Sequence, residues 1–297
     1  MHRDARSIPE ILRQLESLYG KQEPGWPSDP YDFLVWWHCG YPASDTSCAK
    51  GWEKLNSEVG VEPRQLLAAG AARLARVLKA GGMVPELRAM RLMEIAARIQ
   101  DDYGGDLRAG LAGPLSKVRQ ALKRFPNIAD PGADRILLFG GIAPVPAVPS
   151  NCPHVLVRIQ RGQERENYGV TYREAQEAIE AEIPKNFDAR TRAYLLVKRH
   201  GQTVCKRRNP ERENCPISSS CAFFTGKHRG RCSRLTAGPM DYRLQTTRES
   251  LAAVPSTAVD VIRNPSHLAV SHPTLFFGWA GVVGAPIRGM PTFPGSV

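Results

Sequence analysis

The stretch Leu122–Phe139, LKRFPNIADPGADRILLF, has the pattern of a helix, a tight turn and a second helix. The turn is Phe125-Pro126-Asn127-Ile128-Ala129, and apolar residues at helical spacing lie on both sides of it. Asn tolerates the left-handed backbone that such turns use. The stretch therefore predicts a helix-hairpin-helix, and this motif decides how the rest of the chain is interpreted.

The sequence around this motif is also helical in pattern. Leu92, Ile95, Ala96 and Ile99 recur at the spacing of one helix face. Ser7-Ile8-Pro9-Glu10 has the cap, the early proline and the acidic residue that open a helix. Strict alternation is nearly absent, and Val155–Ile159 is the one candidate strand. These patterns predict an all-α protein with about ten helices and short loops.

The composition excludes several classes of protein. Of 297 residues, 42% are apolar and 23% are charged, which is typical of a globular chain and not of a disordered or collagen-like one. No apolar run reaches the ~20 residues of a membrane helix, and no apolar block follows the N-terminus. We expect a monomer in the cytoplasm or nucleoid, with no signal peptide and no membrane partner.

The positive charge is concentrated in one window. The net charge is +11, and residues 198–234 contain ten Lys or Arg against two Glu. Such an excess attracts polyanions, although a solvated run of charges remains an alternative. Four of the seven cysteines, Cys205, Cys215, Cys221 and Cys232, fall in the same window. The other three, Cys39, Cys48 and Cys152, are scattered and are expected to be buried.

The last 63 residues differ from the rest of the chain. Residues 235–297 contain seven prolines, few charges and no sustained helical stripe. We predict an unstructured tail, with a small separate domain as the alternative.

Two motifs together carry a family resemblance. Leu122–Phe139, followed by Gly201–Phe223 (GQTVCKRRNPERENCPISSSCAF), resembles the endonuclease III-like helix-hairpin-helix DNA glycosylases that have an iron-sulfur loop. The resemblance implies two helical lobes that flank a DNA-binding cleft. Residues 30–147 form the lobe with the hairpin, and residues 148–234 form the lobe with the cysteine loop. The helix within residues 1–29 packs on the second lobe.

In this family the hairpin binds a DNA phosphate through backbone amides. The resemblance therefore implies that Pro126, Asn127, Ile128 and Ala129 contact DNA. Asn127 and Ala129 replace the two glycines of the family pattern Leu-Pro-Gly-Val-Gly, and Ala129 is the less permissive replacement. The alternative is an ordinary packing corner between two helices.

The cysteine loop of the family carries four thiolates spaced C-x6-C-x2-C-x5-C around a four-iron, four-sulfur cluster. Cys205, Cys215 and Cys221 keep three of these positions, and the fourth falls on Arg212. An incomplete three-iron cluster, a ligand borrowed from Cys232 and an empty loop all remain open. The resemblance also implies that the basic side chains of the loop face the DNA backbone: Lys206, Arg207, Arg208 and Arg212.

The catalytic positions depart furthest from the family. The Lys that forms a Schiff base falls on Pro131, the Asp that faces the developing sugar charge falls on Pro149, and a family Arg falls on His154. The catalytic residues are therefore unknown. A role for Asp130 or Asp134 is a minor alternative, with Asp134 expected at the solvent or near a phosphate. His154 is expected to be a buried, hydrogen-bonded histidine.

Three functional hypotheses are compatible with this pattern. The leading hypothesis is a base-excision-repair glycosylase that acts on damaged or mismatched double-stranded DNA and is monofunctional, because Pro131 cannot be a nucleophile. The alternative is a catalytically inactive DNA-binding protein descended from a glycosylase. A helical module that binds RNA or protein is a third, weaker hypothesis.

Overall fold

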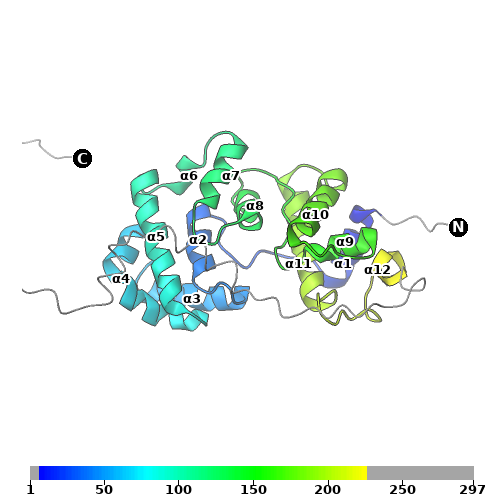
Figure 1. Ribbon diagram of the computed structural model, residues 1–297, viewed down its shortest axis with the longest axis horizontal. Coiled ribbons are helices and arrows are strands. Elements are labelled where there is room, and N and C mark those ends of the chain that lie inside the picture. Colours follow the sequence, from blue (N-terminus) through cyan, green and yellow to red (C-terminus); the bar gives the residue numbers. More distant parts are fainter. Residues whose placement is uncertain (1–6, 226–297) are drawn as a thin grey trace, which may run out of the picture. The chain divides into compact units, whose positions relative to one another are not determined.

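The computed structural model describes residues 7–225, and every regular element in that range is helical (Figure 1). The all-α prediction is thus confirmed for this part of the chain. The α-helices are α1 (Ile8–Tyr19), α2 (Pro30–His38), α3 (Asp45–Glu58), α4 (Pro63–Leu78), α5 (Pro85–Tyr103), α6 (Leu107–Gly110), α7 (Leu115–Lys123), α8 (Asp130–Phe139), α9 (Pro153–Arg161), α10 (Tyr168–Glu182), α11 (Phe187–Thr203) and α12 (Ala222–Thr225). Two 3₁₀ turns, η1 (Lys79–Gly81) and η2 (Ser218–Ser220), complete the set.

Polar caps set where several helices begin. The Asp29 side chain accepts a hydrogen bond from the Tyr31 amide at 2.8 Å, and the Asn186 side chain accepts from the Ala189 amide at 2.8 Å. Each side chain satisfies an amide that has no partner within its own helix. The starts of α2 and α11 are therefore fixed by residues just outside the helices.

The described helices pack around two hydrophobic cores. The first is formed mainly by α2 to α8 and holds Trp36, Leu92 and Leu137 (Figure 1). We call these helices the hairpin lobe. The second core is formed by α1 and α9 to α12 and holds Leu15 and Val155. We call these helices the cysteine lobe.

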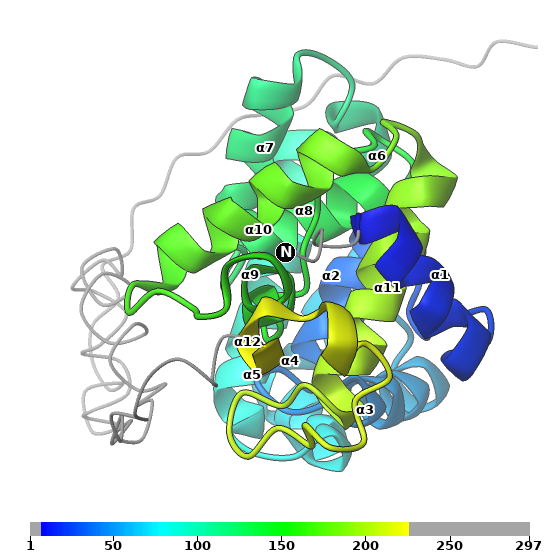
Figure 2. The same ribbon diagram turned by 90° about the vertical axis from the view of Figure 1, so that its right-hand side faces the viewer.

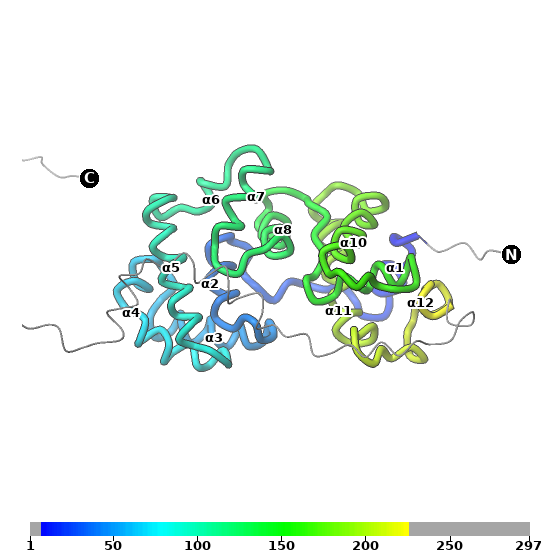
Figure 3. Tube along the Cα trace, viewed as in Figure 1, coloured from blue at the N-terminus to red at the C-terminus, as the bar shows by residue number. Residues whose placement is uncertain are grey.

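The first helix belongs to the second core, although the hairpin lobe follows it in sequence. Glu16 on α1 accepts from Arg192 on α11 at 2.7 and 2.9 Å, and the Ile8 amide donates to Glu182 on α10 at 2.6 Å. The chain then runs through residues 20–29 to α2, as the Cα trace in Figure 3 shows. The cysteine lobe is therefore built from two separated stretches of sequence.

Some expectations are corrected by the structure. Val155–Ile159 is not a strand but the middle of α9, in which seven of nine residues are buried. Cys39, Cys48 and Cys152 are buried, as expected. The predicted tail, residues 235–297, and Cys232 lie outside the described residues. Among helices of the described part, none is long and apolar enough to cross a bilayer.

Candidate functional site

The helix-hairpin-helix forms as the sequence predicts. Phe125 and Ile128 are buried at 2% and 4% exposure, and the Ile128 amide donates to the Phe125 carbonyl at 3.2 Å. Asn127 lies between them with φ of 55°, in the left-handed region that Asn tolerates. The two apolar residues thus anchor the turn and leave Asn127 and Ala129 at its outer side.

Two side chains of the hairpin lobe, Arg91 and His38, contact the residues of the turn. With its amide oxygen turned toward Arg91 of α5, Asn127 accepts from the guanidinium, with the Nε contact at 3.1 Å. His38 of α2 is buried and places its ring nitrogens against the carbonyl oxygens of Pro126 at 2.9 Å and Leu34 at 2.7 Å. Burial lowers the pKa of His38 to about 4, so at pH 7 the ring is neutral and its single N–H donates to one of these two carbonyls.

The N-terminus of α8 is the part of the hairpin that can bind an anion. The first bond within α8 runs from the Ala133 amide to the Ala129 carbonyl at 3.0 Å. The amides before it have no partner in the helix, and they belong to Asp130 and Gly132, because Pro131 has no N–H. Asp130 is exposed here and pairs with Lys123 at 2.7 Å. The end of α8 therefore offers fewer amides than a proline-free helix.

A buried arginine, Arg88, donates hydrogen bonds to several backbone carbonyls near the hairpin. Arg88 is fully buried and donates to the carbonyls of Leu78 at 2.9 Å, Gly82 at 2.7 Å and Met83 at 2.9 Å, and also to the carbonyl of Cys39. These carbonyls lie at the ends of α2 and α4 and just before α5. Arg88 thus ties three helix ends together next to the turn that Arg91 holds.

An exposed apolar group lies at the start of α5. Its members are Met83, Val84, Leu87 and Met90, with exposures of 69%, 48%, 42% and 58%. Val84 also has a left-handed backbone, with φ of 48°, directly before Pro85. Sequence reasoning missed this group. The available signal was that these apolar residues fall off the buried stripe of Leu92, Ile95, Ala96 and Ile99.

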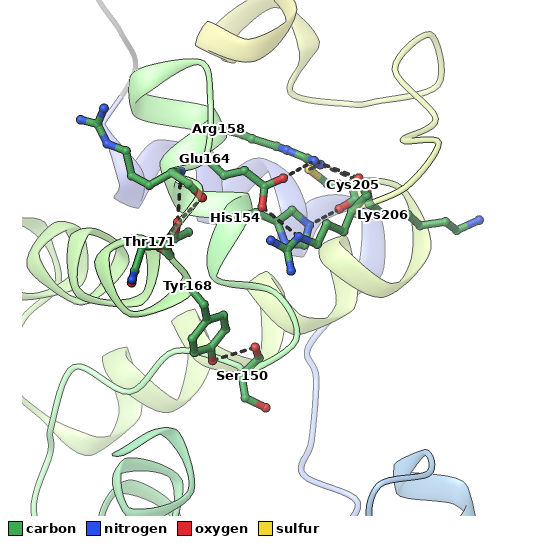
Figure 4. Close-up of polar contacts among 11 residues, drawn as sticks. Ser150, His154, Arg158, Glu164, Tyr168, Thr171, Cys205 and Lys206 are labelled. Carbon is green, nitrogen blue, oxygen red and sulfur yellow. Dashed lines mark hydrogen bonds and ion pairs between the residues drawn. The ribbon is translucent and has the colours of Figure 1, made fainter. Parts of the chain in front are cut away.

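The catalytic carboxylate position of the family is occupied by a buried proline. Pro149 is buried, and the next residue, Ser150, accepts through its carbonyl from the Tyr168 hydroxyl at 2.9 Å (Figure 4). Tyr168 is the first residue of α10 and stacks on Tyr172, with 6.1 Å between ring centroids. The loop before α9 is therefore fixed to α10 by a tyrosine and carries no carboxylate at this point.

The expectation that Asp134 faces solvent or a phosphate is wrong. Its side chain is fully buried and pairs with Arg119 at 2.8 Å. It also accepts from the Tyr172 hydroxyl at 3.0 Å and from Gln176 at 2.8 Å. Burial raises the pKa of Asp134, against the charge of Arg119. Because Tyr172 and Gln176 belong to α10, Asp134 links the hairpin helix to the cysteine lobe.

A second polar link joins the lobes through Asp45 at the start of α3. Asp45 accepts from Lys198 of α11 and pairs with Arg135 of α8 at 3.5 Å. The Arg135 guanidinium lies 3.8 Å from the ring centroid of Trp26, and the Lys198 ammonium lies 4.4 Å from the same ring. Burial lowers the pKa of Lys198, and the nearby Arg135 adds to this effect. Trp26 and Asp45 together accommodate two cations at this boundary.

Two side chains of α9 bind three consecutive carbonyls of the cysteine loop. His154 donates through Nε2 to the Cys205 carbonyl at 2.8 Å, and Arg158 donates to the carbonyls of Lys206 and Arg207, each at 3.0 Å (Figure 4). Glu164 accepts at 2.9 Å from Nη2 of Arg158, the nitrogen that also donates to the Arg207 carbonyl. His154 is thus buried and hydrogen-bonded, as expected. Figure 2 shows the loop and α12 in yellow beside α9.

The three cysteines of the loop do not fit a four-iron cluster as the residues stand. Arg212 fills the fourth position and places its guanidinium carbon 4.5 Å from the ring centroid of Phe223. A protonated guanidinium has no lone pair for a metal. Within residues 7–225, no three His, Cys, Asp or Glu side chains are grouped to hold a metal ion.

The basic side chains of the loop are partly neutralised by acids. Lys206 pairs with Glu211 at 2.6 Å, and Arg207 pairs with Glu164 at 3.0 Å. Arg208 is exposed and has no ion-pair partner within the described residues. Of the four cations expected to face DNA, Arg212 is turned to an aromatic ring and Arg208 is the most available.

No family model matches the chain. The chain is similar to Endonuclease III of Thermotoga maritima, with 23% identity over 223 residues that cover 75% of this chain and 96% of that protein. It is also similar to a thymine-DNA glycosylase of Aeropyrum pernix, with 24% identity over 209 residues that cover 70% of this chain and 89% of that protein.

Solved structures agree with these sequence similarities. A non-covalent complex of Endonuclease III with DNA aligns with a TM-score of 0.60 and 17% identity, over 75% of this chain and 97% of that one. A thermostable thymine-DNA glycosylase aligns with a TM-score of 0.59 and 19% identity, over 74% and 97% of the two chains. The chain therefore has the fold of the endonuclease III-like helix-hairpin-helix DNA glycosylases, in a divergent form.

Proposed function

We propose that the protein is a base-excision-repair DNA glycosylase that binds damaged or mismatched duplex DNA as a monomer and cleaves the N-glycosidic bond. The observation that carries this proposal is the hairpin, whose left-handed Asn127 leads into the open N-terminus of α8. The similar proteins named above, an endonuclease III and a thymine-DNA glycosylase, support the same class of substrate.

The geometry of the hairpin supports the binding of a phosphate. The amides of Asp130 and Gly132 are the free donors at the positive end of the α8 dipole, where phosphates bind well. The carboxylate of Asp130 opposes this attraction, and Lys123 offsets it through their 2.7 Å ion pair. The hairpin is thus suited to one backbone phosphate, which fixes register but not sequence.

The exposed apolar group gives the interface a means to open a duplex. Met83 and Val84 are exposed on the loop before α5, which Arg88 holds through the Met83 carbonyl. Apolar side chains inserted between base steps unstack them and kink DNA, and a glycosylase must take its base out of the stack. We assign Met83 and Val84 to this step.

We propose a monofunctional reaction without a covalent lyase intermediate. Pro131 stands where an amine would form a Schiff base, and its ring nitrogen is part of the backbone. The described carboxylate nearest in sequence to this position is Asp130, which is exposed, whereas Asp134 is buried and held by three partners. Asp130 is therefore the first residue to test for stabilisation of the sugar charge.

The test is an excision assay on duplexes that contain an oxidised pyrimidine, uracil or a mismatched adenine. Strand breaks that appear only after alkali are expected for the purified protein, and Asp130→Asn should slow their formation. Breaks without alkali, with a covalent adduct trapped by borohydride, would contradict the monofunctional mechanism. Asp106→Asn, which alters a carboxylate that caps α6, is the matched control.

One observation favours an inactive DNA-binding protein as a second candidate. Pro149 is buried where the family carboxylate is expected, and Tyr168 fixes the loop behind it. Such a protein would bind a duplex with an abasic-site analogue more tightly than an undamaged duplex, and would excise none of the bases tested. If the unaltered protein excises a base faster than the Asp130→Asn variant does, the inactive-protein hypothesis is excluded.

A further inference from the structure

We propose that Arg158 and Arg212 replace an iron-sulfur cluster in closing the cysteine loop, so that this loop folds without metal. A cluster would close such a loop by binding four thiolates spread along it. Here the same stretch is closed by side chains of α9, by one ring and by the arginine that stands at a ligand position.

The first closure is between α9 and the backbone of the loop. His154 and Arg158 lie one helical turn apart, and they bind the carbonyls of Cys205, Lys206 and Arg207 in order (Figure 4). The Arg158 side chain is 5% exposed, and the amino group that donates to Arg207 also donates to Glu164 at 2.9 Å. A planar guanidinium can hold two carbonyls and a carboxylate at once, which makes Arg158 a fixed cross-link.

The second closure joins the two ends of the loop through Phe223. The guanidinium carbons of Arg158 and Arg212 lie 4.7 and 4.5 Å from the centroid of this ring. Cation–π contacts of this kind are attractive at such distances. Arg212 therefore contacts the end of the loop that follows Cys221, and Arg158 connects that end to the beginning.

The thiols have protein partners in place of iron. The Cys205 sulfur accepts from Arg158 Nη1 at 3.8 Å, and the Cys221 thiol donates to the Arg158 carbonyl at 3.7 Å. The Cys215 sulfur lies 3.8 Å from Nε2 of His200. The cavity among these residues measures about 20 Å³ and is lined by the three cysteines, Arg212 and Phe223. This is room for about one water molecule.

The experiment uses the full chain, purified without oxygen. Iron and acid-labile sulfide are measured, the visible spectrum is recorded, and hydrogen exchange of the amides in residues 204–221 is followed with and without an iron chelator. We expect substoichiometric iron, no cluster absorption and unchanged exchange in chelator. Stoichiometric iron and sulfide, or a loop that opens in chelator, would overturn the proposal. A Cys232→Ser variant that loses such iron would assign the fourth ligand.

Variants test the cross-link directly. Arg158→Ala removes three hydrogen bonds of a charged group, and the loss of even one should raise exchange in residues 204–221 by about tenfold or more. Exchange in Arg158→Lys should fall between that of the unaltered chain and that of Arg158→Ala, because a point-like ammonium lacks the two spaced amino groups that reach the Lys206 and Arg207 carbonyls. Arg161→Ala is the matched control on the same helix, since Arg161 is half exposed and pairs with Glu174. Equal exchange in Arg158→Ala, Arg158→Lys and Arg161→Ala would count against the proposal.

Restoring the missing thiolate gives a gain-of-function test. Arg212→Cys returns the fourth ligand, and reconstitution with iron and sulfide under reducing conditions should then give cluster absorption. The unaltered chain, treated in the same way, should stay colourless. Cluster formation in the unaltered chain would show that Arg212 does not exclude it.

Discussion

Asp134 on the hairpin helix accepts a hydrogen bond from the hydroxyl of Tyr172 on α10, at 3.0 Å, in a site closed to solvent. Arg119 pairs with the same carboxylate at 2.8 Å. The helix that is proposed to hold a DNA phosphate is thus bonded at its middle to the other lobe. Any tilt of one lobe against the other must strain or break this bond.

The first prediction concerns this link between the lobes. Asp134→Ala should lower the free energy of unfolding by about 3 kcal/mol, because it leaves Arg119 and Tyr172 without their buried partner. Tyr172→Phe should cost about 1 kcal/mol, since it removes a single hydrogen bond to the carboxylate. Urea unfolding measures both. Asp130→Ala, an exposed site on the same helix, should change the value by less than about 0.5 kcal/mol.

The second prediction is a pH dependence set by His38. Its pKa is about 4 in the folded protein, below the ordinary 6.5, because burial disfavours the charged ring. Stability from this group is complete above pH 6.5 and is lost as the pH falls toward 4, by up to roughly 3 kcal/mol. His38→Gln should flatten this part of the curve. The measurement is the free energy of unfolding in urea between pH 4 and 8, and an unchanged slope in His38→Gln would contradict it.

The third prediction concerns the left-handed residue of the hairpin. Asn127→Gly keeps the backbone conformation, whereas Asn127→Ala adds about 1 kcal/mol of strain at φ of 55°. Both variants lose the oxygen that accepts from Arg91. We expect the Ala variant to unfold more easily and to bind duplex DNA more weakly than the Gly variant. Equal behaviour of the two would mean that the turn has another conformation in solution.

The fourth prediction separates the cations of the cysteine loop. Neutralising Lys206, Arg207 and Arg208 together should weaken binding to all duplexes about equally and should lower the log–log salt slope by roughly 0.9 for each phosphate that is no longer neutralised. Because Lys206 and Arg207 already pair with Glu211 and Glu164, Arg208→Ala alone should account for most of the change. An unchanged slope in the triple variant, with helical circular dichroism intact, would mean that these charges contact only water.

The fifth prediction tests the exposed apolar group. Met83→Ser with Val84→Ser should reduce the preference for a duplex with an abasic-site analogue over a regular duplex, because a polar side chain is a poor wedge between base steps. The salt slope should stay the same, since no charge changes. Thermal unfolding serves as the control for folding, and binding to the two duplexes by fluorescence anisotropy gives the preference.

The sequence allowed the hairpin to be predicted because its signals are local. Phe125, Asn127 and Ile128 lie within four residues of one another, and each has a conformational preference that does not depend on distant partners. The replacement of the fourth cysteine by Arg212 was visible for the same reason, since the spacing of the ligands is a property of one short stretch. The similarity to solved glycosylases confirms the fold that these two motifs indicated.

What the sequence did not reveal depends on contacts between distant residues. Arg158 donates to carbonyls of residues that follow it by 48 and 49 positions. Asp134 accepts from Tyr172 and Gln176, which follow it by 38 and 42 positions. The helix α9 was misread as well, because Val155, Val157 and Ile159 are β-branched residues at alternate positions, which also suits a strand. The side chains that cross-link the candidate site are therefore the ones that local pattern cannot identify.

The composition of the cysteine lobe has a consequence for the order of folding. Helix α1 leaves the ribosome before the other described helices, yet Glu182 and Arg192 follow their partners Ile8 and Glu16 by 174 and 176 residues. The helices of the hairpin lobe are continuous in sequence and can pack while the chain is still growing, before Tyr194 and Leu195 of α11 join their core. The segment before α2 must wait, with Ile11, Leu12 and Leu15 uncovered, until α11 is complete. A nascent chain arrested before residue 187 should therefore hold a folded hairpin lobe and an undocked first helix that chaperones can bind.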